Sequence, residues 1–165
     1  MESAHHRAQQ IPGQRLKRSK ACSSLTSYNR RAECERKEGT LIRYFLIAAG
    51  GAIGALARFA LGSYVGNRMG ARFPYGTMLI NLSGSFLIGL IMTIIAEHAN
   101  INRNMVYLVP IGFIGAYTTF STFEFETLRL VQDGQMLAAF TNIGLSVVIG
   151  FAMVWLGVVA GRMLQ

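Results

Sequence analysis

The stretch Gly115-Ala-Tyr-Thr-Thr-Phe-Ser-Thr-Phe123 decides how this chain folds, because it sets four aliphatic hydroxyls and two phenylalanine rings in an otherwise apolar segment. Residues 104–123 form a charge-free run of 20 residues, which is long enough to cross a bilayer. Threonine is a weak helix former and glycine leaves the backbone unshielded. We therefore expect the helix to break here and to expose carbonyls to a cavity or an ion, as in a transport pathway.

The rest of the chain supplies three further segments of membrane-spanning length. Of the 165 residues 52% are apolar, and charge-free runs extend over residues 73–96 and 134–161. Another apolar segment, 41–65, carries only Arg43 near its start and Arg58 near its end. The sequence therefore predicts an all-α, multi-pass membrane protein with four transmembrane helices, at about 41–65, 75–96, 104–131 and 135–162.

The chain divides at residue 40 into a basic arm and a membrane domain, 41–165. Residues 1–40 carry nine Lys or Arg and four Glu, a net charge of +5 out of the chain's +8. This composition is typical of a disordered arm near anionic lipid. The arm lacks the interleaved aromatic residues that would favour nucleic-acid binding, and it does not match a secretory signal peptide. Cys22 and Cys34 both lie in it and match no zinc-site spacing, so disulfides hold no part of the membrane domain.

Basic residues are balanced across the two sides of the predicted bundle. When the basic arm and Arg58, which lies within a predicted helix, are left out, the remaining arginines divide three against three, with Arg43, Arg103 and Arg162 on one side and Arg68, Arg72 and Arg129 on the other. The positive-inside rule then gives no preferred orientation. Such balance suits a chain that inserts both ways up and pairs as an antiparallel, dual-topology homodimer; the alternative is that so few arginines carry no signal.

Polar residues recur at helical spacing on three of the four predicted helices. The three stripes are Thr77, Asn81 and Ser85; Thr118, Thr122 and Glu126; and Asn142, Ser146 and Gly150. Each stripe taken alone is compatible with hydrogen bonds between helices, which contribute about 0.6 kcal/mol each. The three together favour a shared, water-accessible seam.

The chemistry of the seam indicates a small, strongly hydrated anion as its cargo. Amides and hydroxyls donate hydrogen bonds, and the positive edges of Phe120 and Phe123 can face an anion without a fixed charge, although such a pair also serves as packing. Glu124 and Glu126 weigh against anions in their own neighbourhood. Arg58 either extends to the lipid interface or draws anions to a vestibule.

The motifs of the common enzymes are absent from the sequence. There is no Gly-rich phosphate loop, no His-Glu-x-x-His helix and no Ser-His-Asp set, so we expect no enzyme. Two rivals to a channel remain. A proton-coupled exporter of the small multidrug type is disfavoured because the first, second and fourth predicted helices hold no membrane-central acid. In a noncatalytic membrane assembly subunit the stripes would only join helices.

Three motifs resemble the Fluc (CrcB) family of bacterial fluoride channels. They are the Gly115–Phe123 stretch, Gly-Thr-x-x-x-Asn at 76–81, and Gly-Gly-Ala-Ile-Gly-Ala-x-x-Arg at 50–58. The resemblance covers 41–165 and leaves 1–40 outside. It implies a passive fluoride channel in the bacterial inner membrane that gives fluoride resistance, built as a dual-topology homodimer with two antiparallel pores. A negative cell interior would drive the anion out by about 2.3 kcal/mol per 100 mV.

The resemblance also implies roles for individual residues. Asn81 would hydrogen-bond fluoride, with Phe120 and Phe123 as the rings along each path. The remaining pore residues would be Ser146, Asn142, Thr122, Thr77 and Glu126, and Arg58 would correspond to the family's helix-1 arginine at the anion vestibule.

The same resemblance implies one structural Na⁺ at the dimer interface. Backbone carbonyls of Gly115 and Thr118 from both chains would hold it. The second glycine common in this motif is Ala116 here, a departure that should leave carbonyl coordination unchanged.

Overall fold

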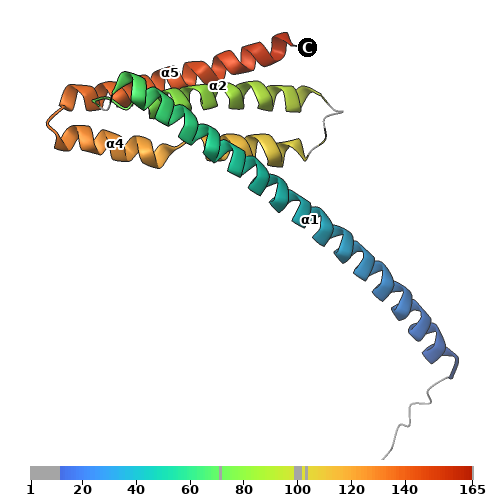
Figure 1. The fold of residues 1–165 in the computed structure, drawn as a ribbon. Coiled ribbons are helices and arrows are strands. Elements are labelled where there is room, and N and C mark those ends of the chain that lie inside the picture. Colours follow the sequence, from blue (N-terminus) through green and yellow to red (C-terminus); the bar gives the residue numbers. More distant parts are fainter. Residues whose placement is uncertain (1–11, 71, 99–101, 103, 165) are drawn as a thin grey trace, which may run out of the picture. The chain divides into compact units, whose positions relative to one another are not determined.

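The computed structural model describes residues 12–70, 72–98, 102 and 104–164, with side chains from residue 39 onward, and the regular elements in these ranges are all helices (Figure 1). The chain divides between Leu41 and Ile42 into two units. Helix α1, Pro12–Met69, begins in the first unit, so the described backbone of the arm for which we expected disorder is helical. Residues 1–11 of that arm, and Arg103, lie outside the described residues.

Three helices are long and apolar enough to cross a membrane. They are the Gly39–Met69 part of α1, helix α2, Tyr75–Glu97, and helix α5, Met136–Met163. Their bounds agree with the predicted spans at 41–65, 75–96 and 135–162. The chain is therefore a helical membrane protein that crosses the bilayer more than once.

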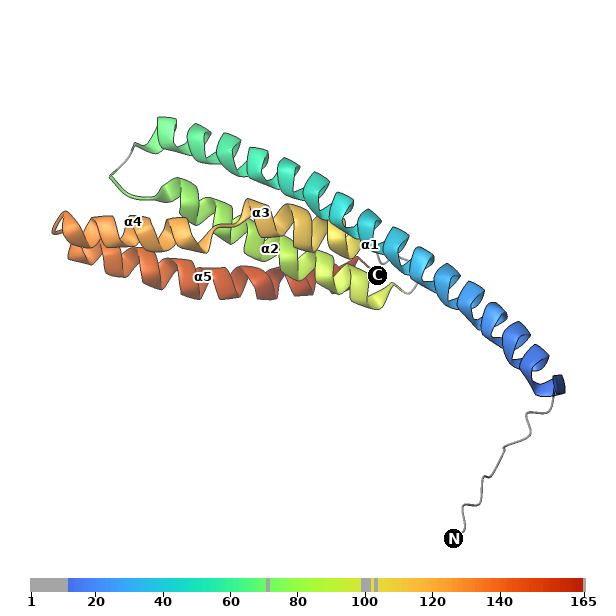
Figure 2. The ribbon, with the colours of Figure 1, turned by 90° about the horizontal axis from the view of Figure 1, so that it is seen from below.

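The fourth predicted span, 104–131, consists of three shorter helices. A π-helix, η1, covers Tyr107–Ile114 and contains Pro110, α3 covers Gly115–Tyr117, and α4 covers Phe120–Gln132. Proline lacks the N–H that a regular α-helical turn needs, which explains the wider turn in η1. Between α3 and α4 the backbone is extended, with ψ of 156° at Thr118 and φ of −149° at Thr119. Figure 2 shows the ribbon leaving the helical path at this point.

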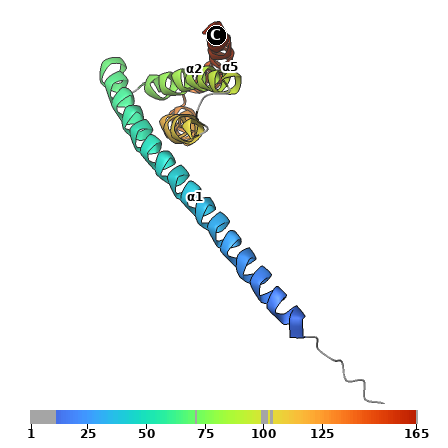
Figure 3. The same cartoon turned by 90° about the vertical axis from the view of Figure 1, so that its right-hand side faces the viewer.

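Helices α2 and α5 pack against each other extensively, and they lie side by side in Figures 2 and 3. Glycines allow this contact. A Cβ atom added at Gly157 would lie only 2.8 Å from the backbone nitrogen of Leu90, and one at Gly89 would lie 3.2 Å from that of Val158. Close backbone approach through small residues is a main source of helix association in membranes.

Glycines also join α1 to the π-helix. Added Cβ atoms at Gly50 and Gly54 would collide with the backbone carbonyls of Leu108 and Phe113, and one at Gly112 would lie 2.9 Å from the carbonyl oxygen of Ile47. The contact holds η1, and with it the start of the segment that leads into the break, against α1.

We expect Gly157→Ala to destabilise the protein by about 1–3 kcal/mol, because the new methyl group forces α2 and α5 apart. Gly144→Ala on the same helix is the matched control, since its Cβ meets nothing within 4 Å. Thermal unfolding of each purified variant in detergent measures the difference. Equal unfolding temperatures for the two variants would contradict the close approach.

Candidate functional site

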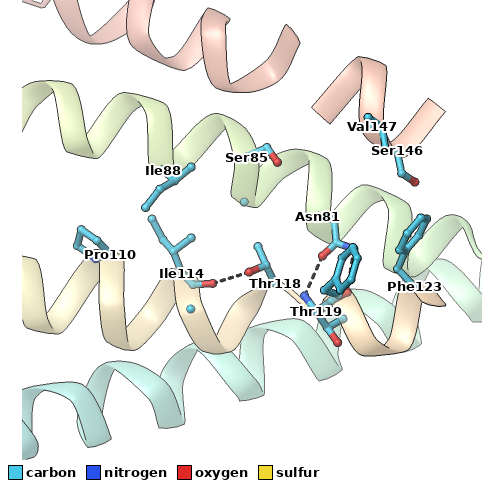
Figure 4. A pocket seen from close by; sticks show the side chains of 13 residues that line it. Asn81, Ser85, Ile88, Pro110, Ile114, Thr118, Thr119, Phe123, Ser146 and Val147 are labelled. Carbon is cyan, nitrogen blue, oxygen red and sulfur yellow. Dashed lines mark hydrogen bonds between the residues drawn. The ribbon is translucent and has the colours of Figure 1, made fainter. Parts of the chain in front are cut away.

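The extended segment between α3 and α4 is held by the side chain of Asn81. The Oδ1 atom of Asn81 accepts a hydrogen bond from the N–H of Thr119 at 2.8 Å, and its Nδ2 donates to the carbonyl oxygen of Thr119 at 3.0 Å (Figure 4). One amide on α2 thus satisfies both backbone groups of a residue that has left the helix. A buried backbone group without a partner would cost several kcal/mol at membrane depth.

Two N–H groups at the break do not bond the carbonyls that they would bond in a continuous helix. The N–H of Thr119 would bond the carbonyl of Gly115, but it bonds Asn81 instead. The N–H of Thr122 would bond the carbonyl of Thr118, but it donates to the hydroxyl of Thr119 at 3.4 Å, which caps α4. The carbonyls of Gly115 and Thr118 therefore lack their helical donors, as oxygens that coordinate a cation would.

A cavity of about 420 Å³ lies beside this break. Its lining includes Asn81 and Ser85 from α2, Phe120 and Phe123 from α4 and Ser146 from α5, together with Gly115, Thr118 and Thr119 (Figure 4). The rings of Phe120 and Phe123 are 5.7 Å apart and inclined by 39°. The hydroxyl of Ser146 is buried without a hydrogen-bond partner in the described structure. No charged side chain belongs to this lining.

A second cavity, of about 650 Å³, lies one helical turn further along the same two helices. Thr77, one turn before Asn81 on α2, and Glu126, one turn after Phe123 on α4, line it, and the Thr77 hydroxyl hydrogen-bonds the Glu126 carboxylate. Two arginines and an aspartate join them, Arg72, Arg129 and Asp133. The predicted seam is thus divided into an uncharged part and a charged part.

Three predicted site residues line neither of these two cavities. Asn142 is 1% exposed and donates to the Thr127 hydroxyl at 2.8 Å, so it joins α5 to α4. The hydroxyl of Thr122 lies 2.8 Å from that of Thr119, within the cap of α4. Arg58 is half-buried on α1.

Sequence reasoning missed the backbone of Thr119, the partner of Asn81 that lies 38 residues away. It also missed the hydrogen bond of 2.8 Å between the hydroxyls of Ser83 and Tyr117, which joins α2 to α3. No local pattern points to either pair. Arg129, by contrast, follows Glu126 by three residues, and this helical spacing was visible in the sequence.

Most of the membrane domain matches a family of known proteins. The sequence model described as CrcB-like protein, Camphor Resistance (CrcB), matches residues 45–158. The chain belongs to the CrcB family. A relative from Acidobacterium capsulatum, named fluoride-specific ion channel FluC, is 50% identical over 121 residues, which are 73% of this chain and 97% of the relative.

Two further CrcB relatives carry the same name. The protein from Solibacter usitatus is 45% identical over 73% of this chain and 99% of its own length. The protein from Geobacter sp. (strain M21) is 46% identical over 72% of this chain and 95% of its own length. This family is one of ion channels and not of enzymes, as the sequence predicted.

We expect Asn81→Ala to raise the hydrogen-exchange rate at the Thr119 amide by about 2- to 10-fold, because it removes a bond that contributes about 0.5–1.5 kcal/mol. Ser85→Ala is the control, since Ser85 lines the same cavity one turn along α2. Exchange measured by mass spectrometry on peptides that contain Thr119 tests the expectation. An unchanged rate in Asn81→Ala would mean that the amide does not hold the break.

Proposed function

We propose that this protein is a fluoride-selective ion channel, which lets F⁻ leave the cytoplasm passively and gives resistance to fluoride. The observation that carries the proposal is the cavity beside the helix break, where hydrogen-bond donors and two phenylalanine rings meet without a charged side chain. The names of the relatives support it, and so does the extent of the match, since each of the three relatives is covered over 95% or more of its length.

The donors of the cavity suit a strongly hydrated anion. A side-chain amide has two N–H groups, and Asn81 spends one of them on the Thr119 carbonyl, so the other remains for an anion. The Ser146 hydroxyl has no acceptor among the described residues. The positive edges of Phe120 and Phe123 complete a lining that can replace water around F⁻, as a dehydrating filter requires.

The pore residues have different parts in this proposal. Asn81, Phe120, Phe123 and Ser146 contact the ion in the uncharged cavity, and Thr77 and Glu126 continue the path in the charged one. Asn142 and Thr122 support the path through their hydrogen bonds to Thr127 and Thr119. Arg58 raises the local anion concentration at a vestibule of the assembled channel.

We further propose that η1, α3 and α4 together form the fourth crossing, and that two copies pair antiparallel in the bacterial inner membrane. Large apolar side chains cover the outside of the single chain; Leu56 is 68% exposed and Val148 is 69% exposed. Phe120, at the edge of the cavity, is 71% exposed, so a single copy leaves one wall of the path open. The balanced arginines favour insertion in both orientations.

The same dimer would hold a structural Na⁺ at the two helix breaks. The described residues contain no cluster of three or more His, Cys, Asp or Glu side chains, so the candidate ligands are backbone oxygens. Carbonyls of Gly115 and Thr118, which lack their helical donors, fit an alkali cation, since unwound helix ends supply such ligands in other membrane proteins. When bound, the cation supplies fixed positive charge that joins the two chains, and it takes no part in conduction.

Two alternative functions have less support. A proton-coupled exporter needs a titratable group in its central cavity, and the lining of the uncharged cavity contains none. A noncatalytic assembly subunit needs its polar side chains paired between helices, whereas the Ser146 hydroxyl is unpaired in the described structure.

Fluoride efflux from proteoliposomes that contain the purified protein tests the function directly with a fluoride electrode. We expect rapid efflux from the parent protein once a K⁺ ionophore balances charge, and slower efflux for Phe120→Ile and Phe123→Ile, which keep apolar volume but lose the ring edge. Phe151→Ile, at a 78% exposed position of α5, is the control. If vesicles with the parent protein release fluoride no faster than protein-free vesicles, the channel is refuted. Normal efflux from both ring variants would mean that the two rings serve only in packing.

The dimer and its cation are tested together. In a variant in which serine replaces Cys22 and Cys34, single cysteines at Asn67 and Asn102, on opposite sides of the predicted bundle, should each be labelled in about half of the copies from either side of the membrane. Replacement of Na⁺ by a large organic cation on both sides should lower efflux slowly. Labelling from one side alone would exclude dual topology, and efflux driven by a Na⁺ gradient would make the protein a coupled transporter.

A further inference from the structure

The charged cavity presents an obstacle to an anion path. An ion that leaves the Phe123 ring toward Thr77 meets the carboxylate of Glu126, one helical turn further along α4. The Glu126 Oε2 atom is buried and has no hydrogen-bond partner in the described structure, so the neutral Thr77 hydroxyl is the only donor shown for this carboxylate. A carboxylate without a counter-charge on the path would repel F⁻ strongly, because the Coulomb energy of two like charges grows as water is excluded.

Arg129 is the cation best placed to offset this charge. It follows Glu126 by three residues on α4, so the two side chains are neighbours on one helix face, and both line the charged cavity. Its positive charge therefore has the sign and the position to stabilise the ionised Glu126 carboxylate. The other charged groups of the lining are Arg72 and Asp133, one of each sign. Asp133 lies one turn beyond Arg129 and thus two turns from Glu126.

Arg129 is also free to respond to an ion. Among the described residues, the one ion pair within 4.0 Å joins Arg162 to Glu97. Arg129 therefore forms no ion pair within that distance in this part of the chain. Arg129 is exposed, while Glu126 is only partly exposed. The guanidinium can therefore turn between the carboxylate and a passing anion without the loss of a fixed partner.

We propose that Arg129 is the counter-charge that makes the Glu126 stretch passable to anions, and thus a positioning residue of the channel that acts through Glu126. The inference rests on the proposed fluoride channel and extends it to the charged cavity. It separates the role of Arg129 from that of Arg58, which lines neither cavity. An interaction with a partly exposed partner contributes at most about 1 kcal/mol, which corresponds to a change in efflux of about fivefold.

Fluoride efflux from proteoliposomes, at low and at high ionic strength, tests the proposal with four variants of the full chain. We expect Arg129→Gln to lower efflux about fivefold at low salt and less at high salt, because salt screens the uncompensated carboxylate. Arg129→Lys should keep most of the parental rate. Glu126→Gln combined with Arg129→Gln should restore at least half of the loss, because it removes the charge that needs compensation.

The fourth variant, Arg162→Gln, is the control for loss of a helix-end arginine and should conduct like the parent protein. Size-exclusion profiles establish that each variant assembles. The proposal is overturned if Arg129→Gln conducts like the parent, or if its defect is independent of salt and persists in the double variant. A parent protein without fluoride efflux refutes the channel itself, which distinguishes that failure from a failure of the Arg129 assignment alone.

Discussion

The two hydrogen bonds between the Asn81 side chain and the Thr119 backbone are the constraint on which the rest of the site depends. An amide carries its donor and its acceptor on different atoms of one plane, so it can pair with both groups of an extended residue, as a neighbouring strand would. This pairing allows a helix to open at membrane depth while the N–H and the carbonyl of Thr119 both keep a partner. It also fixes the direction of the second amide N–H, which in the proposed channel is the donor already oriented toward the anion.

The pairing is possible only because the helices approach closely. Gly157 and Gly89 bring α5 and α2 into backbone contact, while Gly50 and Gly54 do the same for α1 and the π-helix. Small residues contribute little burial of their own, but they set interhelical distances within narrow limits. A displacement of α2 by one side-chain diameter would move the Asn81 amide out of reach of Thr119 and leave two backbone groups in an apolar medium without partners.

Local patterns in the sequence were sufficient for three helices of membrane-spanning length, and eight of the eleven predicted site residues line the two cavities. Charge-free runs marked the spans because a charge inside a bilayer is costly, and helical spacing brought Asn81 and Ser146 to one cavity. Distant pairings were not predictable. The tie of Asn81 to Thr119 depends on how two helices pack, and the burial of Asn142 against Thr127 depends on the α4–α5 contact. Periodicity shows which face is polar, but not which polar group finds a protein partner.

A fixed path and a passive current follow from the same arrangement. Energy coupling requires an element with two conformations and a group that binds the driving ion differently in each. At the break, the Thr119 N–H, the Thr122 N–H and the Thr118 hydroxyl each have a hydrogen-bond partner, so an alternative conformation would have to give up several bonds in an apolar medium. The uncharged cavity contains no side chain that titrates near neutral pH. In the proposed channel the energy for net movement comes from the electrochemical gradient of the anion, and selectivity comes from donors that are held in place before the ion arrives.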